Sequence, residues 1–382
     1  MPLRGEEWSS TVNNKALPLL LVGLLLAQVS YAATYPLNIT PGRSWPLSVV
    51  VDSSRGLVYF DATSGEYPPS GFSFGIINAT THEVVRILPL EVYPGDMVLD
   101  QASGDVYVAG TTSIAVFDQG NQSLAYYPVP GHPILSLAFD SSVSPDLYVT
   151  SGDSLLSLNP RTGAILGNVS FSNDLDGIQL DQSNGRLFVG EYPGSEVSVL
   201  NASNLARMGT IGLPGCCALQ FALDEGTQLL YAATGTDYVY VINAATGTFE
   251  KSVEVAQSGQ NSTNVILADD ATGRVFVGSS PGGSVMEIDG SNGRVSQFIQ
   301  VSSQVAGLAL DTNTRELYAT NYHQLTVMDV SRPRTILVVA LVVVAAVAAG
   351  AVVVYLLVRR RDEQQRREVQ LDAQRSDGVG RK

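Results

Sequence analysis

Residues 178–189 read IQLDQSNGRLFV: a short apolar strand ending in Asp181, a polar turn, and a second strand with an aromatic residue between aliphatic ones. Related stretches occur six more times along the chain. The repeated aspartates lie 40 to 48 residues apart, at Asp52, Asp100, Asp140, Asp181, Asp224, Asp269 and Asp311. A recurring period of this length indicates a repeat architecture.

Each repeat predicts four short strands. A third strand follows the first two, as in YVYVIN at residues 238–243, and a polar turn leads to a fourth, as in GTFEKSVEV at residues 247–255. Four strands in about 40–45 residues are typical of a β-propeller blade, whereas β-helix repeats are much shorter. We therefore expect an all-β, seven-bladed β-propeller over residues 33–331.

The number of strands also predicts how the ring closes. The seventh repeat stops after its third strand, LTVMDV at residues 325–330. Residues 35–40, YPLNIT, precede the first repeat and resemble the fourth strands of the other repeats. We expect this segment to pair with residues 325–330 as a clasp between the two ends of the propeller.

The two ends of the chain carry targeting and membrane signals. An apolar run over residues 16–27, followed by Ser30-Tyr31-Ala32, predicts a secretory signal peptide over residues 1–32. Residues 336–358 are 23 consecutive apolar residues, long enough for a transmembrane helix. This helix and a short outer flank make up residues 332–358.

The charges around the apolar run predict its orientation. Arg359, Arg360 and Arg361 follow it directly and open a charged tail over residues 359–382. Because positive charge favours the cytoplasmic side, we expect a single-pass protein of the cell membrane with the propeller outside and the tail in the cytoplasm. The oligomeric state is open.

Strand direction then predicts which end of the propeller faces away from the membrane. We call the end where the first strands begin the top, and the opposite end the bottom. The last third strand ends at the bottom and enters the membrane segment within about five residues. The top should therefore face outward, through the loops between fourth and first strands and between second and third strands.

The predicted ectodomain is strongly acidic. Residues 35–331 contain ten Lys/Arg and 29 Asp/Glu, a balance of −19. This excludes nucleic acid as a natural partner and favours cations or basic partners, although solubility explains the same excess. Six N-glycosylation sequons agree with an exported surface. They lie at Asn38, Asn78, Asn121, Asn168, Asn201 and Asn261.

The repeats resemble a known family. LYVT at residues 147–150, LYATN at residues 317–321 and NAATG at residues 243–247 are similar to the YVTN-type β-propeller repeats of archaeal surface-layer-like and bacterial secreted proteins. The resemblance covers about residues 35–331. It implies the propeller fold but no shared catalytic motif, and propellers carry many activities.

The repeated aspartates and the two cysteines are candidate functional residues. Repetition in every blade favours a structural role for the aspartates, in which each one caps the turn between the first and second strands. Cys216 and Cys217 are adjacent and are the only cysteines of the chain. We expect them in a top loop, as a disulfide and a candidate ligand-binding element, or as a device that stiffens a turn.

No local spacing in the chain matches a metal or catalytic motif. No cofactor is predicted, but ring closure could bring top-loop groups together around a divalent cation. The candidate metal ligands are Asp96, Asp174, Asp176 and Glu191. The candidate ligand-binding residues, besides the cysteines, are His132, His323, Tyr192, Tyr322 and Tyr67.

The sequence favours recognition over catalysis. Exposed aromatic side chains on an outward rim suit contact with an extracellular protein or glycan. The first hypothesis is thus a membrane-anchored propeller for recognition, adhesion or envelope structure. The alternative is a propeller enzyme of the lyase or lactonase type, with a cation at the mouth of the channel.

Overall fold

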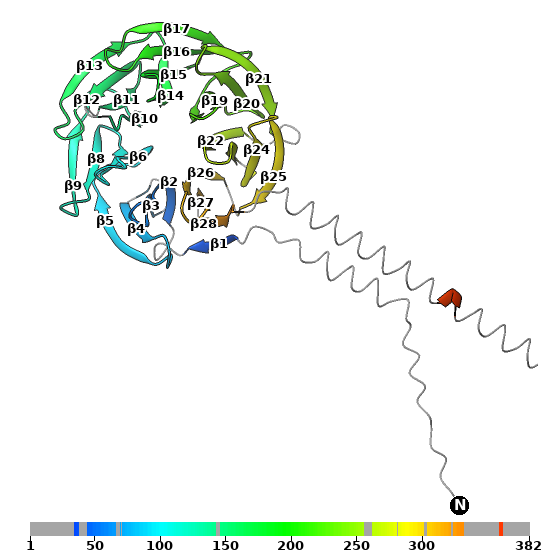
Figure 1. Cartoon of the computed structure of the whole chain (residues 1–382). Helices are drawn as coiled ribbons and strands as arrows, with labels where there is room; N and C mark the ends of the chain where they lie inside the picture. The colour runs from blue at the N-terminus through cyan, green and yellow to red at the C-terminus, as the bar shows by residue number, and fades with distance from the viewer. Residues whose placement is uncertain are drawn as a thin grey trace, which may run out of the picture. The chain divides into compact units, whose positions relative to one another are not determined.

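Every repeat folds into one antiparallel sheet whose strands follow each other along the chain. The computed structural model describes residues 34–37, 44–65, 69, 71–142, 146–255, 262–280, 282–301, 304–321, 324–331 and 359–361. Its strands form seven four-stranded sheets arranged around one axis (Figure 1). The expected seven-bladed propeller is confirmed.

The first four blades use strands β2 to β17. Blade 1 contains β2 (Ser44–Asp52), β3 (Leu57–Ser64), β4 (Gly71–Asn78) and β5 (Val84–Leu90). Blade 2 contains β6 (Met97–Leu99), β7 (Val106–Ala109), β8 (Ser113–Asp118) and β9 (Ser123–Pro128). Blade 3 contains β10 (Ile134–Phe139), β11 (Leu147–Ser151), β12 (Ser154–Leu158) and β13 (Ile165–Ser170). Blade 4 contains β14 (Asp174–Asp181), β15 (Arg186–Tyr192), β16 (Glu196–Asn201) and β17 (Arg207–Gly212).

The remaining strands complete the ring. Blade 5 contains β18 (Gln220–Asp224), β19 (Leu229–Ala233), β20 (Tyr238–Asn243) and β21 (Thr248–Glu254). Blade 6 contains β22 (Ser262–Asp269), β23 (Arg274–Ser280), β24 (Ser284–Asp289) and β25 (Arg294–Gln300). Blade 7 contains β26 (Val305–Asp311), β27 (Glu316–Asn321), β28 (Gln324–Asp329) and β1 (Thr34–Leu37). The first strands surround the axis and the fourth strands form the rim (Figure 1).

Strand β1 is the predicted clasp. It pairs antiparallel with β28, so that Thr34 lies opposite Met328 and Leu37 lies opposite Leu325. The N-terminal strand therefore completes the sheet formed by β26, β27 and β28. Because Met328 lies near the end of β28, the described chain enters the propeller and leaves it at the same end, the bottom.

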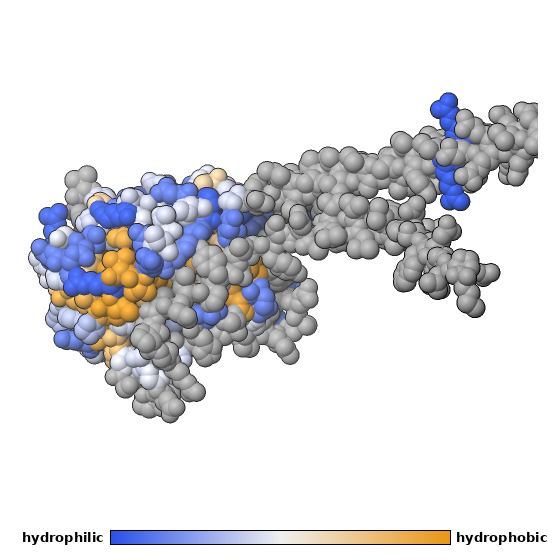
Figure 2. All heavy atoms as spheres, turned by 90° about the horizontal axis from the view of Figure 1, so that it is seen from below, coloured by the Kyte–Doolittle hydropathy of each residue, from blue (hydrophilic) through white to orange (hydrophobic). Residues whose placement is uncertain are grey.

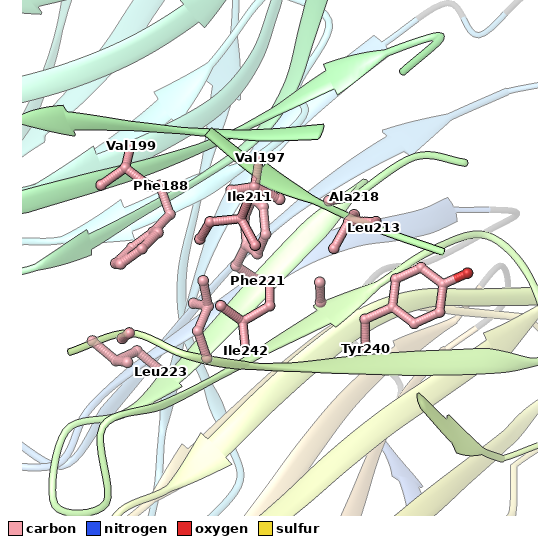
Figure 3. Packing of buried hydrophobic residues seen from close by; sticks show 13 residues of the cluster. Phe188, Val197, Val199, Ile211, Leu213, Ala218, Phe221, Leu223, Tyr240 and Ile242 are labelled. Carbon is pink, nitrogen blue, oxygen red and sulfur yellow. The ribbon is translucent and has the colours of Figure 1, made fainter. Parts of the chain in front are cut away.

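Neighbouring blades pack face to face through apolar side chains. Between blades 4 and 5, Phe188 and Val197 pack with Phe221 and Ile242 (Figure 3). Burial of one such side chain contributes about 1.5–3 kcal/mol to stability. The alternation of these residues along the strands explains why a blade needs a neighbour on each face.

In blades 2, 3 and 7 the aromatic residue of the repeat is a tyrosine that also joins blades through its hydroxyl. Tyr107 Oη donates to the carbonyl of Pro160 at 3.2 Å, and Tyr148 Oη donates to the carbonyl of Ala202 at 3.0 Å. Tyr318 Oη donates to the carbonyl of Ala79 at 3.3 Å, from blade 7 to blade 1. Each of these tyrosines thus buries its ring in the core, and its hydroxyl donates a hydrogen bond to a backbone carbonyl in a turn of the next blade.

The repeated aspartates cap turns at the bottom. Asp52 Oδ1 accepts the backbone N–H of Arg55 at 2.9 Å, Asp100 Oδ1 that of Ala102 at 2.9 Å, and Asp311 Oδ1 that of Asn313 at 2.8 Å. Short side chains that bond the backbone two or three residues ahead stabilise such turns. The expected structural role is confirmed for these residues.

The rim is partly apolar. On the outer strand β5 the side chains of Val84, Val85 and Ile87 are exposed. Apolar surface also appears on the edge of the propeller shown in Figure 2, bordered by hydrophilic atoms.

The predicted signal peptide and the apolar segment 336–358 lie outside the described residues. Among the residues that the structure describes, no helix is long and apolar enough to cross a membrane. The second unit of the chain, Val330–Lys382, is described only at residues 330–331 and 359–361.

Candidate functional site

A cavity of ≈ 360 Å³ lies at the top end of the central channel. It is lined by residues at the beginning of the first strands of all seven blades. Its polar side chains include Asp96, Asp176, Gln220, Asn264 and Gln304, and several leucines contribute apolar surface. Among the described residues of the lining there is no Lys, Arg or His, so this part of the cavity favours a positively charged or hydrogen-bond-donating group.

Irregular pairing of the first strands shapes this cavity. The register of β10 shifts between Ile134 and Ser136, which leaves Leu135 unpaired, and that of β14 shifts between Leu175 and Ile178. A β-bulge of this kind redirects a side chain away from the regular alternation. Two of the residues left unpaired, Leu135 and Asp176, line the cavity.

Asp96 is a brace between two blades. Its Oδ2 accepts hydrogen bonds from Ser136 Oγ and from the backbone N–H of Leu137, both at 2.8 Å, and its Oδ1 accepts the N–H of Met97 at 2.9 Å. Burial raises the pKa of the carboxyl, against the effect of these bonds. Asp96 therefore joins blade 2 to blade 3. Because both of its carboxylate oxygens already accept hydrogen bonds from the protein, it is less suited than a free carboxylate to bind a ligand.

Asp176 has a different environment. Its backbone carbonyl accepts a hydrogen bond from Thr150 Oγ1 at 2.9 Å. Its carboxyl accepts none from the residues that the structure describes, and burial raises the pKa of this group to about 6. An ionisable group that is desolvated without a partner is poised to bind a ligand.

Asp61 is a buried carboxyl that sequence reasoning missed. It is 0% exposed; Oδ1 accepts the backbone N–H of Ser48 at 3.1 Å, and Oδ2 has no partner among the described residues. Burial raises the pKa well above its usual value, and the charge of Asp96 adds to the effect.

Alignment of the repeats could have found Asp61. In the second strand it occupies the position that Thr150 and Thr320 hold in blades 3 and 7. Each of those hydroxyls bonds to a backbone carbonyl of the following blade, that of Asp176 at 2.9 Å and that of Leu47 at 2.7 Å. A protonated Asp61 could make the same kind of contact.

The four metal candidates do not meet as one group. Asp96 and Asp176 line the cavity, whereas Asp174 and Glu191 are not part of its lining. Glu191 is buried, and its carboxylate accepts hydrogen bonds from Ser198 Oγ at 2.7 Å and from Asn173 Nδ2 at 3.1 Å. Within the described part of the chain, no cluster of three or more His, Cys, Asp or Glu could hold a metal ion. The cation site stays a prediction.

Of the remaining candidates, the two that the structure describes lie at the top end of the propeller. His132 is exposed, and Gly152 packs against its ring. The side chain of Tyr192 is also exposed. Tyr67, Tyr322 and His323, with the sequons Asn38 and Asn261, lie outside the described residues.

The described sequons lie away from the top cavity. Asn78, Asn121 and Asn201 are in turns between third and fourth strands, as expected, and Asn168 lies within the outer strand β13. The bottom position of the three turns leaves the top end free of any sugar attached there.

Cys216 and Cys217 form a disulfide in the loop before β18. Cys217 is buried with φ +69°, and its backbone N–H donates to the carbonyl of Gly194 in the top loop of blade 4 at 2.7 Å. Cys216 is exposed. The pair therefore lies on the top face, as expected, and contacts the loop that carries Tyr192.

Comparison with known proteins gives no family for this chain. No protein-family model matches it, and none of the curated proteins is significantly similar to it in sequence. The resemblance to YVTN-type repeats therefore stays a prediction.

Proposed function

We propose that this chain is a membrane-anchored surface protein that recognises a ligand with the top face of its propeller. The observation that carries the proposal is the position of the two ends of the propeller. Thr34 lies opposite Met328 at the bottom, so the predicted signal and membrane segments both connect there. A ring tethered at its bottom presents the opposite end to its surroundings.

The features of the top face support recognition. The channel mouth offers Asp176, whose carboxyl has no described partner, among amide and leucine side chains. Binding pockets commonly combine apolar walls with a few polar groups that fix the orientation of the ligand. Binding to an extracellular protein or glycan needs no further chemistry.

Catalysis of the lyase or lactonase type is the second candidate. Two carboxyls, Asp96 and Asp176, line one cavity and could contribute to a cation site. Metal analysis of the purified full chain would decide this point. One equivalent of a divalent metal that is lost in Asp176→Asn would favour the enzyme, and a metal-free protein that still binds its ligand would favour recognition.

The placement of the protein can be tested in intact cells. An epitope inserted between residues 33 and 34 should be accessible to antibody and to added protease, whereas a tag after residue 382 should be protected until the membrane is opened. The recognition role can be tested by screening the purified full chain against extracellular proteins and glycans. A tag exposed at the C-terminus, or binding that Asp176→Arg leaves unchanged, would refute the corresponding part of the proposal.

A further inference from the structure

The charge of the propeller is divided between its two ends. The top loops and adjoining strand ends carry nine described carboxylates: Glu91, Asp96, Asp153, Asp174, Asp176, Glu191, Glu196, Asp237 and Glu254. Among the described residues, Arg207 is the one cation whose side chain contacts a top loop: its guanidinium lies 4.1 Å from the ring centre of Phe171, between β13 and β14. Carboxylates of one sign gathered on one face produce a field that attracts cations and basic partners.

The bottom end pairs some of its carboxylates with arginines. Arg55 pairs with Asp52 at 2.7 Å, and Arg315 pairs with Asp269 across two blades. Arg274 lies 3.5 Å from the carboxylates of both Asp269 and Glu287. Arg55, Arg274 and Arg315 thus form ion pairs with carboxylates at the bottom.

The exposed tyrosines of the described chain lie at the same end as these nine carboxylates. Tyr93, Tyr192 and Tyr238 are 48%, 50% and 40% exposed, and all three belong to top loops or to the strand ends beside them. Tyr93 is held by an edge contact with the ring of Phe72, with 5.5 Å between centroids. Exposed aromatic rings supply contact area at low entropic cost and attract ammonium or guanidinium groups.

Each of these rings has a carboxylate beside it. Tyr192 lies opposite Asp174 in the pairing of β14 with β15, and Tyr238 lies opposite Glu254 in the pairing of β20 with β21. Residues directly opposite in an antiparallel pair share one face of the sheet. Tyr93 follows Glu91 by two residues in the loop between blades 1 and 2. Ring and carboxylate together suit one basic side chain.

The channel mouth adds a deeper position. The carboxyl of Asp176 lines the same cavity as Leu135, Leu219 and Val305. The alkyl part of a lysine or arginine side chain can lie on apolar surface while its charged group reaches a carboxylate. The unpartnered carboxyl of Asp176 is suited to receive that group.

We infer that the top face binds a basic polypeptide, which places lysine or arginine side chains against the tyrosine–carboxylate pairs and one of them at the channel mouth. This inference rests on the proposed function and names the class of partner. An anionic glycan would meet carboxylates of its own sign. A metal ion would lack a described group of three ligands. The basic polypeptide is the partner that satisfies both the charge and the rings.

The experiment uses the full chain in nanodiscs of neutral phosphatidylcholine, so that the lipid does not attract the probe. The probe is a fluorescent 12-residue peptide of alternating Lys and Ser, followed by anisotropy. A peptide with Gln in place of Lys is the comparison. We expect the Lys peptide to bind at least tenfold more tightly, with an affinity that falls as salt is raised.

Two pairs of variants locate the surface. Asp174→Asn with Glu254→Gln, and separately Tyr192→Ser with Tyr238→Ser, should each weaken binding of the Lys peptide at least fivefold. The matched control, Glu83→Gln with Glu225→Gln, removes two exposed carboxylates from the bottom and should change the affinity less than twofold. Thermal unfolding of every variant establishes that the propeller is intact.

The outcomes separate this inference from the proposed function. Equal affinity for the Lys and Gln peptides, or equal weakening by the control pair, would overturn the basic partner. Binding of a neutral glycan that depends on Tyr192 and Tyr238, without binding of the Lys peptide, would overturn it while the outward-face function stands. A failure of the proposed function would appear separately, as an epitope at residue 33 that antibody cannot reach on intact cells.

Discussion

Tyr35 lies opposite Val327 in the only sheet of the described structure that combines strands from both ends of the propeller. This pairing converts a row of seven sheets into a closed ring. The backbone of β1 covers the outer edge of β28, which would otherwise present unpaired N–H and C=O groups to solvent.

Deletion of residues 34–37 should destabilise the propeller. Net contributions of about 1 kcal/mol for each backbone hydrogen bond suggest a loss of about 2–4 kcal/mol. At about 2 °C per kcal/mol for a domain of this size, the midpoint of thermal unfolding should fall by about 4–8 °C. Deletion of residues 379–382 is the control and should leave the midpoint unchanged. An unaltered midpoint after the first deletion would show that the clasp adds no stability.

Gly190→Ala should be costly because two blades approach closely there. A Cβ atom at Gly190 would lie 2.1 Å from the backbone oxygen of Ala218, so either β15 or the loop before β18 must move. We expect a loss of about 3 kcal/mol in the free energy of unfolding. In the outer strand β17, a Cβ atom at Gly209 would meet nothing within 4 Å. Gly209→Ala should therefore change the free energy of unfolding by less than about 0.5 kcal/mol. Chemical denaturation of both variants would test this; equal losses would contradict the close approach.

Asp61→Asn should stabilise the protein at neutral pH. The folded state raises the pKa of Asp61 well above its ordinary value. The stability that the protonated carboxyl contributes is therefore fully present below about pH 4, the ordinary pKa, and is lost as pH rises through the folded pKa. The amide keeps an acceptor for Ser48 and supplies a donor without ionising. The gain should be about 1–3 kcal/mol, and the decline of stability above pH 4 should become shallower.

Asp289→Asn serves as the control for this pH dependence. A hydrogen bond from Ser291 is the main cause that lowers the pKa of Asp289, so its contribution is present above about pH 4 and is lost as pH falls. The variant should therefore flatten the acid side of the stability profile and leave the alkaline side unaltered. If Asp61→Asn behaved in the same way, its carboxyl would be ionised in the folded protein.

Asp269→Ala should weaken the contact between blades 6 and 7. Burial acts to raise the pKa of Asp269, but hydrogen bonds from Arg315 and Thr272 outweigh it and hold the pKa below its usual value. Removal of the carboxyl leaves Arg315 without this partner, at a cost of about 3 kcal/mol. The turn aspartate Asp100 is more exposed, and Asp100→Ala should cost about 1 kcal/mol. Similar losses in urea unfolding would contradict an interblade role for Asp269.

Reduction of the Cys216–Cys217 disulfide should affect stability only slightly. A bond between adjacent residues closes a very short segment and constrains the unfolded chain little. The double variant Cys216→Ser with Cys217→Ser should lower the unfolding midpoint by less than about 3 °C, and reductant should then have no further effect. A fall of 10 °C or more would mean that the disulfide holds blades 4 and 5 together.

Much of the fold was predictable because local patterns repeat. Each repeat contains an aspartate that caps a turn and an aromatic side chain that must be buried. Both features depend on residues close together in the sequence, so they can be recognised from the sequence. The deficit of one strand after residues 325–330 was enough to predict the clasp with β1. The top position of Cys216 and Cys217 followed from strand direction alone.

Only the tertiary structure decided which carboxyls have partners. Asp96 and Asp176 were equivalent candidates in the sequence, yet the first is bonded to blade 3 and the second has no described partner. The same holds for the unpaired Oδ2 of Asp61 and for the carboxylates beside Tyr192 and Tyr238. A sequence repeat specifies the blade, because a blade is built from neighbours along the chain. Contacts between blades join residues some 40 positions apart, and these contacts determine which charges remain for a ligand.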